Sequence, residues 1–352
     1  MSEVSEGQVR TQGLGVVGER PGSQRLETRA VSHSYLTRGF LISGLALFAI
    51  LVWSIGPSSI GSLLWKVGWG LPLCFVPYGL VIAFETLGWW FAFPSNHHSM
   101  RFNDLVRLTV ATKAVQLLTP SITQAGEFMK VHLLRMTGVK VDIGAASVVV
   151  AKTTITIAEL LFIGLGLTFA LGYMTVEPII AMSVAVGIVV MGVGVVGVLI
   201  WQRIGLFWPL IWVSRRIGAL ATFVDRHKEL LSSTESIVRG HLDERTRFGW
   251  SCLWFFLGWT SGIVEAWAFL GLLGLPYDVS SALVIQVWAV IVTRLTTFIP
   301  GNLGAQEAGI VMIFSFLGFS PETAMAFAVL RRLRQLGWIA AGLGYLAKMS
   351  RG

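Results

Sequence analysis

The chain of 352 residues is short of charged side chains and of cysteine. Asp, Glu, Lys and Arg make up only 13% of it, against roughly 25% in soluble domains. Its mean hydropathy is +0.71. The two cysteines, Cys74 and Cys252, stand in separate apolar stretches, so no disulfide framework and no metal-type spacing is indicated. These shortages exclude an ordinary soluble domain and favour a multi-pass membrane protein.

Catalytic and nucleotide-binding motifs are missing as well. Two matches to Gly-x-Gly-x-x-Gly, at 13–18 and 192–197, do not follow a strand in a βαβ unit. The adjacent His97 and His98 have no further ligand at metal-type spacing. We therefore expect no enzyme activity, no cofactor and no metal. The net charge of +8 does not indicate nucleic acid, because Lys and Arg lie between apolar runs, where they orient a membrane protein.

Seven apolar stretches are long enough to cross a bilayer, since about 20 residues span its core: 36–55, 71–93, 143–171, 176–200, 248–273, 279–298 and 320–347. Residues 101–118 are more amphipathic. Two short segments, 119–135 and 299–318, each contain Pro, Gly and Glu and are typical of broken or re-entrant helices. Residues 1–34 are polar, without an apolar signal-peptide core, and predict a disordered tail.

Positive charge predicts the orientation. Residues 201–247 hold eight Lys and Arg and the N-terminal tail holds several more, whereas the loops 172–175 and 274–278 hold none. The tail and the loop 201–247 should therefore be cytoplasmic. This pattern holds if 101–135 contributes an even number of crossings. The loop is amphipathic and predicts a connector between a membrane region at 35–200 and another at 248–348.

Four polar or proline positions recur 180 residues further along the chain. Glu85, Pro120, Glu127 and Lys152 return as Glu265, Pro300, Glu307 and Arg332. An ionisable side chain in hydrocarbon costs several kcal/mol, so such positions are usually functional. We interpret them as two inverted repeats of an all-α membrane protein, the first at about 71–171, meeting at one polar site.

The duplicated acids and bases have two interpretations. Glu127 with Lys152, and Glu307 with Arg332, could neutralise each other in an empty site and bind a zwitterionic or phosphate-bearing headgroup in an occupied one. They could instead be structural ion pairs between helices. For Glu85 and Glu265, proton coupling and helix packing are both open. Lys113 and Arg294 precede the broken segments and are candidates for gating, and Glu159, which has no counterpart, is expected to be structural.

The broken segments resemble a known family. GEFMKVHLLRMTGVKVDIGAASVVVAK and TTFIPGNLGAQEAGIVMIFSFLGFSPETAMAFAVLRRL are similar to the two hallmarks of the lysylphosphatidylglycerol-synthase-type transmembrane family. The resemblance covers about residues 36–348 and implies a flippase-like fold. It also implies that these residues line a substrate site: Gly126, Glu127, Lys152, Pro300, Gly301, Asn302, Gly304, Glu307 and Arg332. Asn302 stands where the family usually has a second Gly, and Lys152 where it usually has Arg.

The expected function is lipid transport. The resemblance implies a flippase that moves a phospholipid or other amphiphilic lipid between leaflets of a bacterial inner membrane, as a stand-alone member without the soluble synthase domain. Membrane lipids would be its partners. Two alternatives remain open: a proton-coupled secondary transporter of a small charged solute, and an accessory membrane subunit that contacts a lipid-synthesising enzyme through 201–247.

Overall fold

The computed structural model describes residues 53, 65, 67–95, 100–118, 125–173, 177–214, 216, 218–276, 278–297, 302 and 304–349. The regular elements among them are all helical, so the predicted all-α class is confirmed for the described residues. The tail 1–34, most of the span 36–55, and Pro120, Pro300 and Gly301 lie outside them. The elements are η1 (Gly68–Cys74), α3 (Val76–Phe91), α4 (Phe102–Leu118), α5 (Ala125–Met136), α6 (Val141–Tyr173), α7 (Pro178–Gly205), α8 (Trp208–Ser214), α9 (Gly218–Arg226), α10 (Lys228–Asp243), α11 (Arg245–Leu272), α12 (Val279–Leu295), α13 (Ala305–Phe316) and α14 (Pro321–Met349).

Within the described part of the chain, four helices are long and apolar enough to cross a membrane. They are Pro72–Phe91, Val141–Gly172, Ala181–Gly205 and Arg245–Leu272. The helices α12 and α13 are apolar but shorter. The long helix α14 has the length, but its middle carries Arg331, Arg332 and Arg334. Long apolar helices of this kind fit a multi-pass membrane protein.

Two clusters hold most of the buried apolar side chains among the described residues. One contains Trp89, Leu105, Leu133 and Ile143 from α3, α4, α5 and α6. The other contains Phe269, Ile285, Phe314 and Phe327 from α11, α12, α13 and α14. We call residues 67–173 the first half and residues 245–349 the second half. The first cluster also contains Phe255 of α11 and Ile339 and Leu343 of α14, so part of the second half is packed into it.

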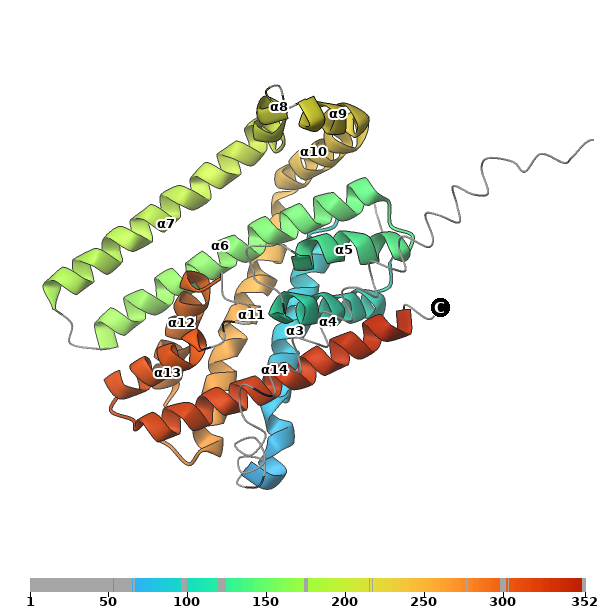
Figure 1. Cartoon of the computed structure of the whole chain (residues 1–352). Helices are drawn as coiled ribbons and strands as arrows, with labels where there is room; N and C mark the ends of the chain where they lie inside the picture. Colours follow the sequence, from blue (N-terminus) through green and yellow to red (C-terminus); the bar gives the residue numbers. More distant parts are fainter. Residues whose placement is uncertain are drawn as a thin grey trace, which may run out of the picture.

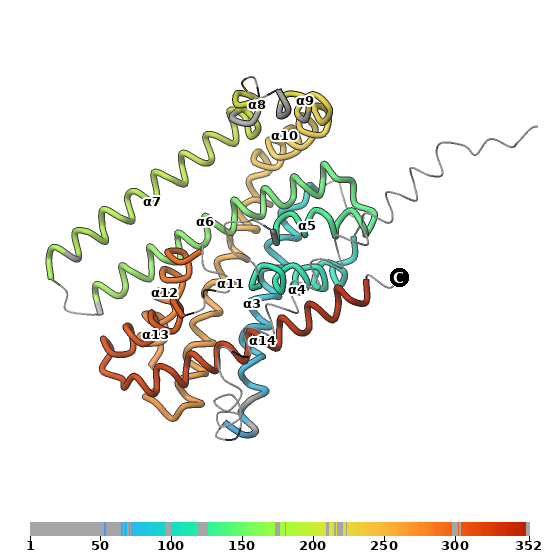
Figure 2. The backbone as a smooth tube through the Cα atoms, in the orientation of Figure 1, coloured from blue at the N-terminus to red at the C-terminus, as the bar shows by residue number. Residues whose placement is uncertain are grey.

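The halves interlock. The helix α3 packs along α11, α4 packs on α14, and α12 packs on α6. Figure 1 shows α3 and α11 running in opposite directions, and Figure 2 shows the same for α6 and α14. The first helix of each half thus contacts its counterpart, and the long last helix of each half receives the second helix of the other.

Helix bounds repeat between the halves. The helix α5 covers 125–136 and α13 covers 305–316, and α6 begins at 141 where α14 begins at 321. These pairs are separated by the same offset as the repeated polar positions. A glycine with positive φ follows each short helix, Gly138 at +89° and Gly318 at +82°. A backbone in that region favours glycine and ends a helix sharply, so both short helices turn back alike.

The helix α7 lies at the edge of the molecule. It runs beside α6 and reaches the connector helices α8, α9 and α10 (Figure 1). None of residues 181–201 is buried, and large side chains such as Ile179, Met182, Val189 and Val193 are exposed. An apolar surface of this length is suited to contact with lipid chains.

Candidate functional site: a charged cavity between the halves

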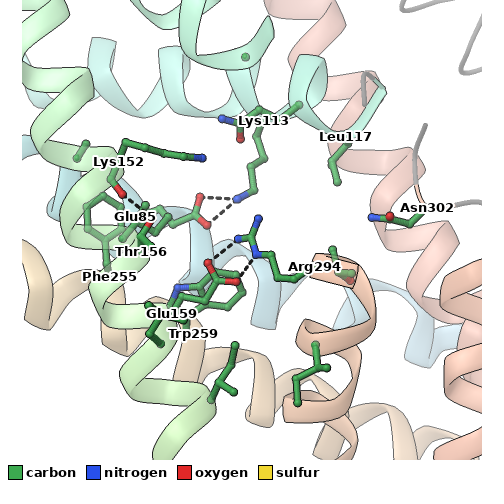
Figure 3. Close-up of a pocket in the computed structure, with 18 of the residues that line it drawn as sticks. Glu85, Lys113, Leu117, Lys152, Thr156, Glu159, Phe255, Trp259, Arg294 and Asn302 are labelled. Atoms are coloured by element: carbon green, nitrogen blue, oxygen red, sulfur yellow. Dashed lines mark hydrogen bonds and ion pairs between the residues drawn. The ribbon is translucent and has the colours of Figure 1, made fainter. Parts of the chain in front are cut away.

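A cavity of about 740 Å³ opens between the two halves (Figure 3). Residues from α3, α4, α5, α6, α7, α11, α12, α13 and α14 line it. Its ionisable lining residues, apart from Tyr78, are Glu85, Lys113, Glu127, Lys130, Lys152, Glu159 and Arg294. These are three acids and four bases, so the described lining carries one positive charge in excess.

The residue Lys113 joins α4 to α3. Its Nζ lies 2.6 Å and 2.8 Å from the two carboxylate oxygens of Glu85. Both side chains are mostly shielded, with exposed fractions of 21% for Lys113 and 13% for Glu85. Figure 3 shows Lys113 pointing into the centre of the cavity. These two predicted gating or coupling residues therefore form one shielded ion pair.

The residue Arg294 joins the two halves. Its guanidinium Nη2 donates to Oε2 of Glu159 at 2.7 Å, and its Nε donates to Oε1 of the same carboxylate. The ring of Trp259 lies 5.7 Å from the guanidinium. This fork-to-fork pairing connects α12 to α6 across the cavity (Figure 3). The carboxylate of Glu159 thus belongs to the cavity wall, a role that no repeat position indicated.

The carboxylate of Glu127 serves two lysines. Lys130 Nζ lies 3.0 Å from one oxygen and Lys152 Nζ lies 3.5 Å from the other. The side-chain amide of Gln116 also donates to Glu127, at 3.3 Å. Lys152 is the most accessible of the group, with 45% of its side chain exposed. Of the two lysines bound to Glu127, Lys152 is therefore the more open to an entering anion.

Close packing against Gln116 explains why glycine, Gly126, precedes Glu127. A Cβ at Gly126 would lie 2.0 Å from Cγ of Gln116, which no real contact allows. The absence of a side chain there lets α4 approach the start of α5. Gln116 can then reach the carboxylate of Glu127. The Gly-Glu pair is therefore a packing device that brings a polar group into the cavity.

The matching pair in the second half also forms. Arg332 Nε lies 2.6 Å from Glu307, and its Nη2 donates to the carbonyl oxygen of Asn302 at 3.1 Å. Asn302 and Gly304 have positive φ, +50° and +79°. Asn302 lines the cavity, whereas Glu307, Arg332 and Gly304 are not among its lining residues. The common spacing from acid to base thus predicts an ion pair in each half, but only the pair in the first half faces the cavity.

The remaining predicted acid, Glu265, is buried on α11. Arg334 Nη2 lies 3.0 Å and Arg331 Nε 3.8 Å from its Oε1. These groups belong to a smaller chamber that adjoins the main cavity. Arg331, Arg332 and Arg334 occupy three of four consecutive positions on α14 and cannot all share one helix face. The structure turns Arg331 and Arg334 toward Glu265.

The cavity has an apolar end. Beyond the charged groups its walls are formed by Ile163 and Leu167 on α6 and by Val184, Gly187 and Met191 on α7. The helix α7 is the outlying helix with an exposed apolar surface. The cavity therefore has a charged end at the interface of the halves and an apolar end toward the periphery. This two-ended character matches that of an amphiphilic lipid.

Several lining residues were absent from the predicted site. Lys130 and Gln116 lie one helical turn from Glu127 and Lys113, so helical spacing is the signal that finds them. No sequence signal indicated Gln306 and Gln335, which lie on α13 and α14. Among the described residues, no three His, Cys, Asp or Glu side chains stand close enough to bind a metal ion.

The comparisons with known proteins place the chain in a family. No curated protein and no solved structure matched it. The model of one protein family, described as the lysylphosphatidylglycerol synthase TM region, matches residues 39–344. That range includes the first half, the connector, the second half as far as residue 344, and every residue of the cavity. The chain therefore belongs to the lysylphosphatidylglycerol synthase transmembrane-region family.

Proposed function

We propose that this protein moves an amphiphilic lipid between the leaflets of the inner membrane. The observation that carries the proposal is the two-ended cavity. In this proposal the lipid headgroup occupies the charged end near Glu127 and Lys152. Its acyl chains extend past Ile163 and Leu167 toward the apolar surface of α7. Binding of both parts at once favours an amphiphile over a purely polar solute.

The charges favour an anionic headgroup. Glu127 is shared by Lys130 and Lys152, which accounts for the positive excess of the cavity. A phosphate could approach the accessible Lys152 while Glu127 remains bound to Lys130. Charge-assisted hydrogen bonds of this kind are stronger than neutral ones. The groups recognise the cargo without covalent chemistry, so the proposed activity is transport.

The two halves are proposed to be inverted repeats. The equal helix bounds and the opposite directions of α3 and α11 and of α6 and α14 support this arrangement. The orientation with a cytoplasmic connector fits it too. In Figure 1 the connector helices α8–α10 and the C-terminal end of α14 lie toward the upper right. The end of α6, the start of α7 and the end of α11 lie toward the lower left, which is the opposite side of the molecule. Inverted repeats supply two equivalent conformations that face opposite leaflets.

The test is leaflet-resolved lipid flipping in proteoliposomes. A panel of labelled anionic, zwitterionic and cationic lipids is compared between the wild-type protein and Glu127→Gln. We expect the wild-type protein to flip anionic lipids fastest and the variant to be at least tenfold slower. Asp243→Asn is the control, because Asp243 lies on the connector, 77% exposed, in an exposed pair with Arg203. Wild-type rates in a folded Glu127→Gln variant would refute this site.

A second candidate is a proton-coupled transporter of a small charged solute. The observation that favours it is the Glu85–Lys113 pair, which lines the cavity and could exchange a proton with a bound solute. This candidate predicts thermal stabilisation by water-soluble anions and no lipid flipping. It also predicts proton uptake that Glu85→Gln abolishes. Lipid flipping that is independent of a proton gradient would exclude it.

A further inference from the structure

A second chamber adjoins the main cavity on the side of α11 and α14. It has a volume of about 150 Å³, and we call it the arginine chamber. It shares Tyr78, Glu85, Lys113 and Arg294 with the main cavity. Its own ionisable residues are Glu265, Arg331 and Arg334, which the proposed transport site does not use.

Charge pairing in the arginine chamber leaves one cation unmatched. Lys113 is matched by Glu85 and Arg294 by Glu159. The single carboxylate of Glu265 serves both Arg331 and Arg334. The neighbouring Arg332 has its own acid, Glu307. Among the described residues, the chamber therefore holds one positive charge without a negative partner.

The undescribed parts of the membrane regions offer no acid for it. No Asp or Glu stands between Glu27 and Glu85. The undescribed residues after Glu85 contain none either, because the gaps read NHHS, TPSITQ, MTV, Arg215, Ile217, Tyr277, FIPG, Leu303 and SRG. The only undescribed acids are the four in the N-terminal tail, Glu3, Glu6, Glu19 and Glu27. The excess charge is thus a property of the sequence in this region.

Both arginines are buried and have hydrogen-bonding capacity to spare. Arg331 and Arg334 are 6% and 5% exposed. The Nε atom of each is shielded from solvent and makes no hydrogen bond. Arg334 stacks on Tyr78 with its guanidinium 4.0 Å from the ring centre, and Arg331 donates to Gln286. These contacts hold both guanidinium groups in the chamber wall.

We propose that the arginine chamber binds one small inorganic monoanion, a halide or a monovalent phosphate, independently of the lipid. A buried charge without a partner is strongly destabilising, and an anion between the guanidinium groups offsets it. Guanidinium groups suit such a ligand because each presents several N–H donors. The chamber is about one fifth the volume of the main cavity. That size suits a small anion and not a phospholipid with its chains.

The anion in the arginine chamber could also be the phosphate of a lipid headgroup that reaches in from the main cavity. The experiment therefore has two arms on the purified full chain. In the first arm, bromide or phosphate is titrated against gluconate at constant ionic strength, in a detergent without lipid. In the second arm, a short-chain phosphatidylglycerol is titrated in gluconate. Melting temperature and calorimetry report binding in both.

We expect saturable stabilisation by bromide or phosphate in the first arm. Arg334→Gln should weaken this binding at least tenfold, because it removes the excess charge. Glu265→Gln should strengthen it, because that variant leaves both arginines without an acid. Arg203→Gln is the matched control, since Arg203 is 62% exposed and lies on the connector side of α7. The two variants are expected to change anion affinity in opposite directions, so either one alone still tests the proposal if the other fails to fold.

Three results would overturn the proposal. They are no saturable effect of small anions, binding only of the lipid in the second arm, and equal weakening by Glu265→Gln and Arg334→Gln. The proposal does not depend on lipid transport. Intact anion binding in a protein that flips no lipid would refute the proposed function and leave the arginine chamber standing.

Discussion

Replacing Glu85 by Gln should leave the charge of Lys113 in the cavity without its negative partner. Lys113 Nζ contacts both oxygens of this carboxylate, at 2.6 Å and 2.8 Å. Two unit charges about 4 Å apart interact by about 4 kcal/mol at an effective dielectric constant of about 20. Breaking a fully buried pair costs about 3–5 kcal/mol. Because one fifth of Lys113 is exposed, we expect Glu85→Gln to destabilise the protein by about 2–4 kcal/mol.

The double variant separates pairing from simple loss of contacts. Glu85→Gln with Lys113→Gln leaves no charge stranded, so its destabilisation should be smaller than that of either single variant. The coupling energy between the two positions should be about 2 kcal/mol. Thermal unfolding in detergent, followed by tryptophan fluorescence, measures it. At about 2–4 °C per kcal/mol, each single variant should lose about 4–16 °C.

An exposed ion pair provides the control. Arg203 and Asp243 are 3.6 Å apart with 62% and 77% of their side chains exposed. Exposed pairs contribute about 0–1 kcal/mol, so Asp243→Asn should leave the melting temperature almost unchanged. If the losses of the two single cavity variants instead add in the double variant, the Glu85–Lys113 pair does not stabilise the fold and our interpretation is wrong.

Two further predictions concern packing and pH. A Cβ at Gly342 would lie 2.6 Å from the carbonyl oxygen of Val110, whereas Gly344 on the same helix has open space. Gly342→Ala should therefore lower the melting temperature through overpacking of about 1–3 kcal/mol, and Gly344→Ala should leave it unchanged or raise it; equal effects would contradict the contact between α4 and α14. His241 on the connector is buried with both ring nitrogens unbonded, and burial lowers its pKa to about 4. Since the unfolded state takes up the proton first, the stability that His241 supplies is complete above about pH 6.5 and is lost as the pH falls toward 4. His241→Leu should flatten the melting temperature over that range, and an unchanged pH profile in the variant would count against a buried neutral imidazole.

Much of the helical framework could be predicted from hydropathy. The stretch 143–171 corresponds to α6, 176–200 to α7 and 248–273 to α11, because long apolar runs leave a chain in lipid no alternative to the helix. The constant offset between the repeated positions anticipated that α5 and α13 would have matching bounds. It also predicted which acid would pair with Lys152 and which with Arg332.

The sequence did not predict which of the two repeated ion pairs would line the cavity. Glu127 with Lys152 lines the cavity, whereas Glu307 with Arg332 is enclosed between α13 and α14. A repeat fixes the spacing of residues within each half, but exposure depends on which helices of the other half cover them. The pairing of Arg294 with Glu159 has the same origin, because their contact joins the halves and has no counterpart among the repeated positions.

The sequence by itself determined the helical class, the family and the presence of repeated acids and bases, because each follows from local composition or from spacing along the chain. The tertiary structure decided which charges share a cavity, and it alone showed that Glu127 and Glu265 each serve two cations. Electrostatic interaction depends on distance in space and on burial. Both are set only when α4, α6, α11 and α14 pack together.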